Sequence, residues 1–234
     1  MIYCNNCLQP DSRPNTQFTA GLCPACIFAT QKEMFGWNLR VQEIKTVIAP
    51  YVSDAKDEPY DAILGVSGGK DSTKLALWAR DFLKLRILLV VISYPPEQLT
   101  YRGARNLANL ANKGFDIYTV APSPGIWREL MKRGFVEGGN WGRSTEMALF
   151  AGVPRIAIQE KIKLILWGEN PGLQLGDLAT LGRAGWDGNN LKKMNTLASV
   201  SSDWLYKSGI DKRSLRPYEY PSEEEFEKIG RAHV

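Results

Sequence analysis

The chain has 234 residues, of which 44% are hydrophobic and 23% are charged, and its formal net charge is +4. This length suffices for one well-buried domain with a small accessory module and excludes two large domains. The mild positive charge does not indicate a nucleic-acid partner, and no apolar run approaches the roughly 20 residues of a membrane span. The first residues lack the pattern of a secretory signal, so we expect a cytoplasmic protein.

All four cysteines lie near the amino terminus, at Cys4, Cys7, Cys23 and Cys26. The two C-x-x-C pairs have the spacing of a four-thiolate zinc site, whose closed tetrahedral shell gives it a structural role. We therefore predict a zinc-ribbon module over residues 1–30 that holds one structural Zn²⁺. Two disulfides are disfavoured because the expected compartment is reducing. Redox-active pairs are a weaker alternative, and iron in the same four-sulfur site stays open.

Residues 31–57 are expected to form a connecting helix and a linker. Apolar residues recur at helical spacing from Met34 to Ile48, and we expect this helix to pack the ribbon against the following domain. The polar stretch "SDAKDEPYD" then has the composition of a linker.

Short apolar runs alternate with helical segments over residues 58–176. The expected strands are 62–66, 86–93, 115–121 and 163–170, and the expected helices are 72–83, 100–111, 125–135 and 144–161. Near-continuous apolar strands alternating with helices predict an α/β domain with a parallel sheet covered on both faces. In such sheets ligands bind beyond the carboxyl ends of the strands. Residues 177–228, a partial C-terminal region, contain helical fragments and polar turns without a recognisable fold.

A glycine turn directly follows the first expected strand and opens the first expected helix. It consists of Ser67, Gly68, Gly69, Lys70, Asp71 and Ser72. Glycines allow close approach of the backbone, and amides at a helix start face an anion, so this turn predicts a phosphate-binding loop. It has neither the Walker spacing nor that of a dinucleotide fingerprint. The plain alternative is a structural strand-to-helix turn.

The loop closely resembles the S-G-G-x-D-S signature of the PP-loop ATP pyrophosphatases. The resemblance implies a parallel-sheet adenine-nucleotide-binding domain of the PP-loop, HUP-like kind, which uses ATP and Mg²⁺. In that superfamily the loop holds the β- and γ-phosphates, and ATP is split to AMP and pyrophosphate. Asp71 would then help to place Mg²⁺ or the attacking group, and Lys70 would stabilise developing phosphate charge.

Over residues 1–176 the chain resembles the N-acetyl sugar amidotransferase family. The resemblance rests on "YCNNCLQPDSRPNTQF", "GLCPAC", "YDAILGVSGGKDST" and "LILWGEN", in that order. It implies adenylation of an acetamido group on a nucleotide-linked sugar, then displacement of AMP by ammonia from a glutaminase and cyclase-like pair. Such enzymes serve lipopolysaccharide, O-antigen and flagellin glycan synthesis. Glu169 and Asn170 would orient substrate or ammonia, although a solvated strand end explains them nearly as well.

Two other functions are compatible with the sequence. Some PP-loop tRNA thiolation enzymes also carry N-terminal C-x-x-C pairs, but they need further cysteines, and none follows Cys26 here. A non-catalytic zinc-ribbon module on an inactive nucleotide-binding fold is the third possibility, which the intact loop disfavours.

Trp141, Arg143 and Glu146 are candidate substrate contacts, and a loop leading into a helix explains them equally well.

The last six residues, Ile229 to Val234, read "IGRAHV". One frame of a widely used sequencing adaptor encodes this peptide, so we expect residues 229–234 to be a non-native tail and the natural chain to continue. His233, the one histidine of the chain, lies in this tail and receives no role.

Overall fold

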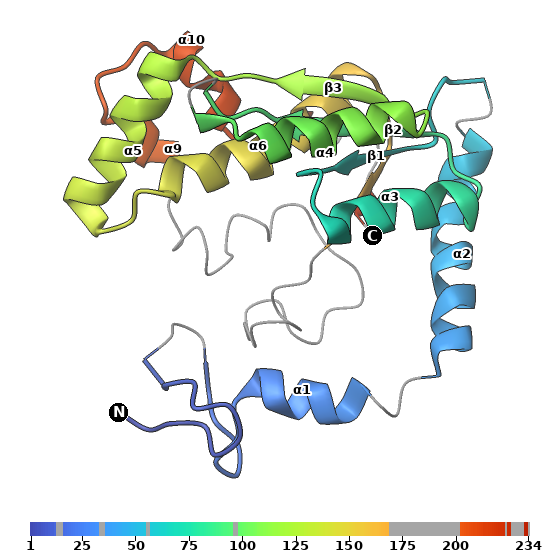
Figure 1. Ribbon diagram of the computed structural model, residues 1–234, viewed down its shortest axis with the longest axis horizontal. Coiled ribbons are helices and arrows are strands. Elements are labelled where there is room, and N and C mark those ends of the chain that lie inside the picture. Colours follow the sequence, from blue (N-terminus) through green and yellow to red (C-terminus); the bar gives the residue numbers. More distant parts are fainter. Residues whose placement is uncertain are drawn as a thin grey trace.

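The computed structural model describes residues 1–12, 16–32, 36–54, 57–95, 98–168, 202–222, 224–225 and 232–233. Its centre is a parallel sheet in the order β3-β2-β1-β4-β5 (Figure 1). The strands are β1 (Ala62–Gly65), β2 (Ile87–Ile92), β3 (Asp116–Val120), β4 (Leu164–Leu166) and the two-residue β5 (Ala232–His233). The predicted parallel sheet is therefore confirmed.

The helices between residues 37 and 159 lie close to where the hydrophobic pattern predicts them, whereas the sequence predicted no helix at residues 24–32. They are α1 (Pro24–Lys32), α2 (Trp37–Asp54), α3 (Lys70–Asp81), α4 (Tyr101–Asn112), α5 (Pro124–Gly138), α6 (Arg143–Gln159), α9 (Ser202–Tyr206), α10 (Lys212–Leu215) and the 3₁₀ turn η3 (Arg216–Tyr218). None of the described helices combines the length and apolarity that a bilayer crossing requires.

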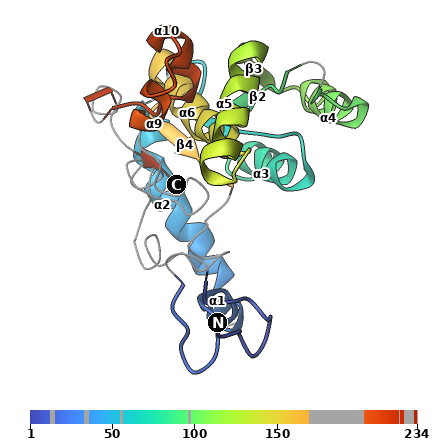
Figure 2. The same cartoon turned by 90° about the vertical axis from the view of Figure 1, so that its left-hand side faces the viewer.

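Alternation along the central strands divides the core into two layers, one on each face of the sheet. Ala62 and Leu64 of β1 pack with α2, α3 and α4, whereas Ile63 packs with α5, α6, α9, α10 and η3. Figure 2 shows α3 and α4 on one side of the strands and α6, α9 and α10 on the other. Both faces are covered because successive side chains of a strand point to opposite faces, and here both sets are apolar.

An ion pair fixes the amino ends of β1 and β2 against each other. The Asp61 carboxylate is 4% exposed and lies 2.6 Å from Nη2 of Arg86. Its other oxygen accepts hydrogen bonds from the backbone N–H and Nε of Arg86, at 2.7 and 3.1 Å. These contacts fix the register in which Ala62 of β1 pairs with Ile87 of β2.

The connecting helix packs differently from the sequence-based expectation. From Ile44 onward, α2 contributes Ile44, Ile48 and Tyr51 to the sheet core. In its amino half the side chains of Trp37 and Leu39 are exposed. The helix thus leads from the cysteine module to the sheet (Figure 1), and it packs into the domain core from Ile44 onward.

The edge strand β5 falls inside the tail that we expect to be non-native. Ala232 and His233 pair in parallel with Leu164 and Ile165 of β4. Any short extended segment can add to an open sheet edge through backbone hydrogen bonds. The pairing therefore does not bear on the origin of residues 229–234, which stays a prediction.

Candidate functional site

The glycine loop lies where the order of the strands reverses. From β1 the chain proceeds through α3 to β2 and β3 on one side, and later returns to β4 on the other side of β1. In open α/β sheets, ligands bind in the crevice at such a switch point, beyond the carboxyl ends of the strands. The loop therefore occupies the position at which open α/β sheets bind ligands.

Gly68 requires glycine for two independent reasons. Its φ angle is +75°, in the left-handed region that L-residues rarely adopt. A Cβ atom there would also lie 3.1 Å from Cβ of Asn106 and 3.2 Å from Cδ2 of Leu107, both in α4. Because Gly68 carries no side chain, the loop can turn tightly against α4. The sequence did not predict this contribution of α4, since nothing near Asn106 marks it as a neighbour of the loop.

Two serines connect the ends of the loop. The backbone N–H of Ser67 donates to Oγ of Ser72 at 3.4 Å, and the two hydroxyl oxygens are 3.5 Å apart. Oγ of Ser72 donates to the carbonyl oxygen of Gly69 at 3.3 Å, and the N–H of Gly69 donates to Oγ of Ser67. Such bonds hold the turn in a closed form, and Ser67 is exposed at its surface.

Helix α3 begins at Lys70, two residues before the predicted start, so Lys70 and Asp71 belong to its first turn. The residue that precedes the helix is Gly69, and among the described residues no side chain caps this helix start. Uncapped amides in a first turn, together with the helix dipole, attract an anion. The side chains of Lys70 and Asp71 are both exposed beside them. The loop can therefore bind phosphate through its backbone amides, and the ammonium of Lys70 and the carboxylate of Asp71 lie beside them.

Two predicted site residues, Glu169 and Asn170, lie outside the described residues. The chain is described up to Gly168, just beyond β4. A Cβ atom on Gly168 would lie 3.1 Å from Cδ2 of Leu75 in α3. The end of β4 is thus close to the helix that the loop opens, while the roles of Glu169 and Asn170 stay predictions.

The four cysteines gather at one point, as their spacing predicts. The sulfur atoms of Cys4, Cys7, Cys23 and Cys26 lie within 4.8 Å of one another, and none of the four forms a disulfide. The Sγ atoms of Cys7 and Cys23 are 3.6 Å apart. A tetrahedral site with Zn–S bonds of about 2.3 Å has sulfur–sulfur edges of about 3.8 Å, so the arrangement fits a four-thiolate metal site.

The chemistry of the sulfur atoms also fits a cation. Hydrogen bonds from backbone amides, chiefly that of Cys23, lower the pKa of Cys4 to about 6. Burial raises the pKa of Cys23 to about 12. Four thiolates at these distances repel one another unless a cation lies between them. Few apolar side chains support the module, since Phe18, Leu22 and Ala25 are the partly buried ones packed against the cysteines.

The candidate substrate contacts around residues 141–146 fall into two groups. Trp141 is exposed at the turn before α6. The guanidinium of Arg143 lies over the ring of Trp204, 5.4 Å from its centroid, so Arg143 helps to hold α9. Ser144 and Thr145, which the sequence did not single out, are buried in the first turn of α6. This segment mainly joins α5, α6 and α9.

Comparison with known proteins finds distant structural similarity at low TM-scores and low sequence identity. The chain matches no protein-family model and no curated protein. It is similar to an NMN synthetase from Francisella tularensis, with a TM-score of 0.40 and 13% identity over 80% of this chain and 90% of the other. It is also similar to an NH3-dependent NAD synthetase from Campylobacter jejuni subsp. jejuni, with a TM-score of 0.39 and 16% identity over 80% and 90% of the two chains.

A third similar structure is the U34-tRNA thiolase NcsA from Methanococcus maripaludis with its [4Fe-4S] cluster. The TM-score is 0.38 and the identity 17%, over 98% of this chain and 71% of the thiolase. At identities of 13 to 17%, the functions of these proteins do not transfer to this chain.

Proposed function

We propose that the protein is an ATP-dependent, AMP-forming amidotransferase that converts an acetamido group of a nucleotide-linked sugar into an acetamidino group. The observation that carries this proposal is the loop Ser67–Ser72, a closed glycine turn at the switch point that opens an uncapped helix. Its position and its exposed Lys70 and Asp71 support binding of the ATP phosphates.

The sugar as substrate rests on the sequence resemblance of residues 1–176. That resemblance includes the loop, both cysteine pairs and the segment Pro10-Asp11-Ser12-Arg13-Pro14. The proposed ammonia source is a glutaminase and cyclase-like pair, and the proposed process is the synthesis of surface polysaccharide or flagellin glycan.

The reaction has two steps: the first attaches AMP to the amide oxygen, and the second displaces AMP by ammonia. The amide oxygen of the acetamido group attacks the α-phosphorus of ATP, and the bond from that phosphorus to pyrophosphate breaks. Ammonia then attacks the amide carbon, AMP departs with the former amide oxygen, and the nitrogen loses protons to give the amidine. Activation is needed because an amide oxygen leaves poorly, whereas AMP leaves readily.

The residues of the loop have distinct roles in this proposal. Backbone amides at the start of α3 and the ammonium of Lys70 hold the β- and γ-phosphates and stabilise charge as pyrophosphate leaves. Asp71 places Mg²⁺ or the attacking group, and the ion supplies neutralisation of phosphate charge. Glu169 and Asn170 orient the substrate or ammonia. The four cysteines hold a structural Zn²⁺ away from the chemistry.

The proposal is tested by incubating the protein with ATP, Mg²⁺ and ammonium, with and without a diacetamido nucleotide sugar. We expect AMP that depends on the sugar, and a sugar product lighter by the difference between an oxygen atom and an NH group. AMP that depends instead on tRNA and a sulfur donor would replace the proposal with a thiolation function. Failure to bind ATP and Mg²⁺ would favour a non-catalytic module.

A further inference from the structure

A cavity lies on the opposite face of the sheet from α3. Its volume is about 650 Å³, within the range of small-molecule sites. Val120 at the end of β3 and Ile156 of α6 line its apolar part. Because α3 and the loop belong to the other layer, this cavity is separate from the candidate nucleotide site.

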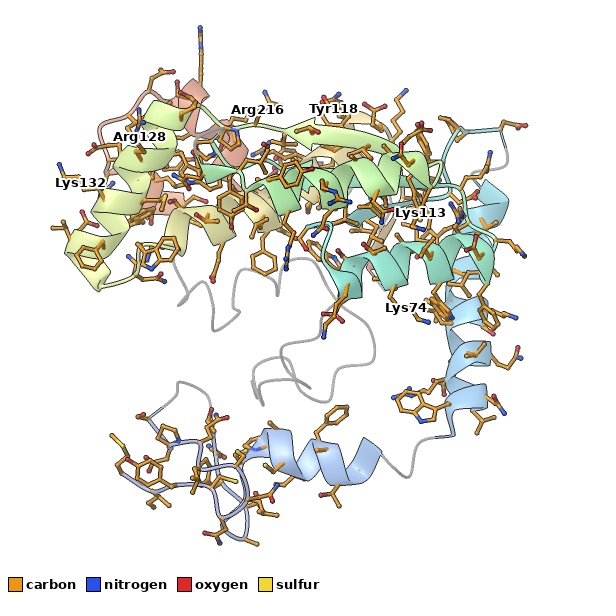
Figure 3. The ribbon with its side chains drawn as sticks, in the orientation of Figure 1. Lys74, Lys113, Tyr118, Arg128, Lys132 and Arg216 are labelled. Carbon is orange, nitrogen blue, oxygen red and sulfur yellow. The ribbon has the colours of Figure 1, made fainter. Side chains whose placement is uncertain are left out.

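The polar lining of this cavity is strongly positive. It contains Arg155 from α6, Arg213 from α10, Arg216 from η3 and a single carboxylate, that of Glu225. Arg213 and Arg216 are exposed and come from consecutive turns of the chain. In Figure 3, Arg216 lies beside β3, whereas Arg128 and Lys132 lie on α5 at the far left of the view.

Arg155 is fixed in place but keeps donors for a ligand. Its side chain is 16% exposed, and its Nε donates to the backbone oxygen of Glu219 at 2.6 Å. Its Nη2 lies 3.6 Å from a carboxylate oxygen of Glu219, and its Nη1 lies 3.8 Å from one of Glu225. Both distances exceed a hydrogen bond, so the terminal nitrogens keep N–H donors that a ligand in the cavity can use.

Arg155 lies among two carboxylates and a further guanidinium. Burial lowers the pKa of its guanidinium, the carboxylates of Glu225 and Glu219 act in the opposite direction, and the positive charge of Arg216 adds to the lowering. An anion bound between the guanidiniums would remove this repulsion. Three guanidiniums against the carboxylates of Glu219 and Glu225 leave a net positive charge, and clustered guanidiniums are suited to the oxygens of a phosphate group.

We propose that the cavity beside β3 is a second ligand site, in which Arg155, Arg213 and Arg216 bind the phosphate of a small phosphorylated molecule. The apolar wall at Val120 and Ile156 would receive the rest of that molecule. A purely structural role for Arg155, which ties α6 to the segment around Glu219, does not account for Arg213 and Arg216 lining the same cavity.

The test measures how inorganic phosphate protects arginines of the full chain from phenylglyoxal, at constant ionic strength, with each site followed by mass spectrometry. We expect Arg213 and Arg216 to be protected along one saturation curve while Arg128 on α5 keeps reacting. In Arg213→Ala, the phosphate concentration that protects Arg216 should rise about tenfold or more, the effect of one lost charge-assisted hydrogen bond. Lys132→Ala, a charge removed outside the cavity, should leave it unchanged.

Three results would overturn the proposal. Arg216 could react equally fast with and without phosphate, Arg128 could be protected to the same degree, or citrate could protect at lower concentration than phosphate. The Lys70→Ala variant separates this site from the loop, because protection of Arg216 should persist in it. No ATP or sugar is present, so the outcome is independent of the proposed amidotransferase activity.

Discussion

Three glycines, two in the loop and one after α4, let the cost of an unusual backbone conformation be measured apart from the cost of a close contact. Gly68 has a φ angle of +75° and close neighbours in α4, Gly114 has a φ angle of +82° with nothing within 4 Å of its Cβ position, and Gly69 has an ordinary φ of −69°. The three positions form a matched set, because alanine at Gly114 tests conformation alone.

We expect Gly114→Ala to lower the free energy of unfolding by about 1–2 kcal/mol, the usual penalty for a left-handed L-residue. Gly68→Ala should cost more, because Cβ must also displace Asn106 of α4. Gly69→Ala should cost least, since its nearest contact is the movable hydroxyl of Ser67 at 3.3 Å. Urea titrations of the three variants measure this order, and equal losses at Gly68 and Gly114 would refute the contact with α4.

Lys70 and Asp71, the charged residues of the loop, are exposed, so their replacement should lower the reaction rate and leave the stability of the fold unchanged. We expect Lys70→Ala and Asp71→Asn to lower the rate of AMP formation about 100-fold or more, the scale for losing an electrostatic catalytic group. Lys74→Ala is the matched control, an exposed lysine one turn further along α3 (Figure 3). Turnover in Lys70→Ala equal to that of Lys74→Ala would remove Lys70 from the mechanism.

At the scale of elements, α9 is attached to α5 through Glu137 and Arg133. Oε2 of Glu137 accepts from Nε1 of Trp204 at 2.7 Å, and Oε1 lies 2.7 Å from Nε of Arg133. Arg133 also donates to the backbone oxygen of Trp204 at 2.7 Å. The bond from Arg133, followed by that from Trp204, lowers the pKa of Glu137 below its usual value of 4.5.

A lowered carboxyl pKa gives stability that is present above 4.5 and is lost as the pH falls through the folded-state pKa. We therefore expect Glu137→Gln to be less stable than wild type at neutral pH, and the difference to shrink in urea titrations carried out progressively below pH 4.5. Glu129→Gln, an exposed change on the same helix, should show little difference at any pH. A difference for Glu137→Gln that stays constant in acid would contradict the ion-pair account.

The cysteine module depends on metal more than on packing. We expect Cys23→Ser to lower the zinc content of the purified protein and to make residues near Phe18 more accessible to protease, because few apolar contacts remain to hold the module. Gln31→Ala, an exposed change near the end of α1, is the control. Mass spectrometry of the metal content measures the zinc bound by each variant. An unchanged zinc content in Cys23→Ser would argue against the four-thiolate site.

At the scale of the whole molecule, the sequence predicted the sheet, its helices and the convergence of the cysteines. Apolar runs fix where strands lie, and the loop fixes where α3 begins to within two residues. The order of the strands depends on long-range packing, such as the approach of Val153 in α6 to Gly65 in β1, for which no local pattern exists. The sequence therefore could not place α4 against the loop.

The arginine cavity illustrates the same limit. Arg155 and Arg213 are far apart in the chain, and nothing in the local sequence of either marks it as a neighbour of the other. Their convergence depends on η3 packing against α6. Local sequence predicts elements well, whereas sites assembled from distant elements need the fold.

The central claim is that this loop supports transfer of AMP to an amide oxygen. The most direct test supplies a nucleotide sugar whose acetamido oxygen carries a heavy-oxygen label, together with ATP, Mg²⁺ and ammonium, and analyses AMP by mass spectrometry. The account predicts that the label appears in the phosphate of AMP and disappears from the sugar. Unlabelled AMP beside a sugar that keeps its labelled oxygen, or formation of ADP in place of AMP, would contradict it.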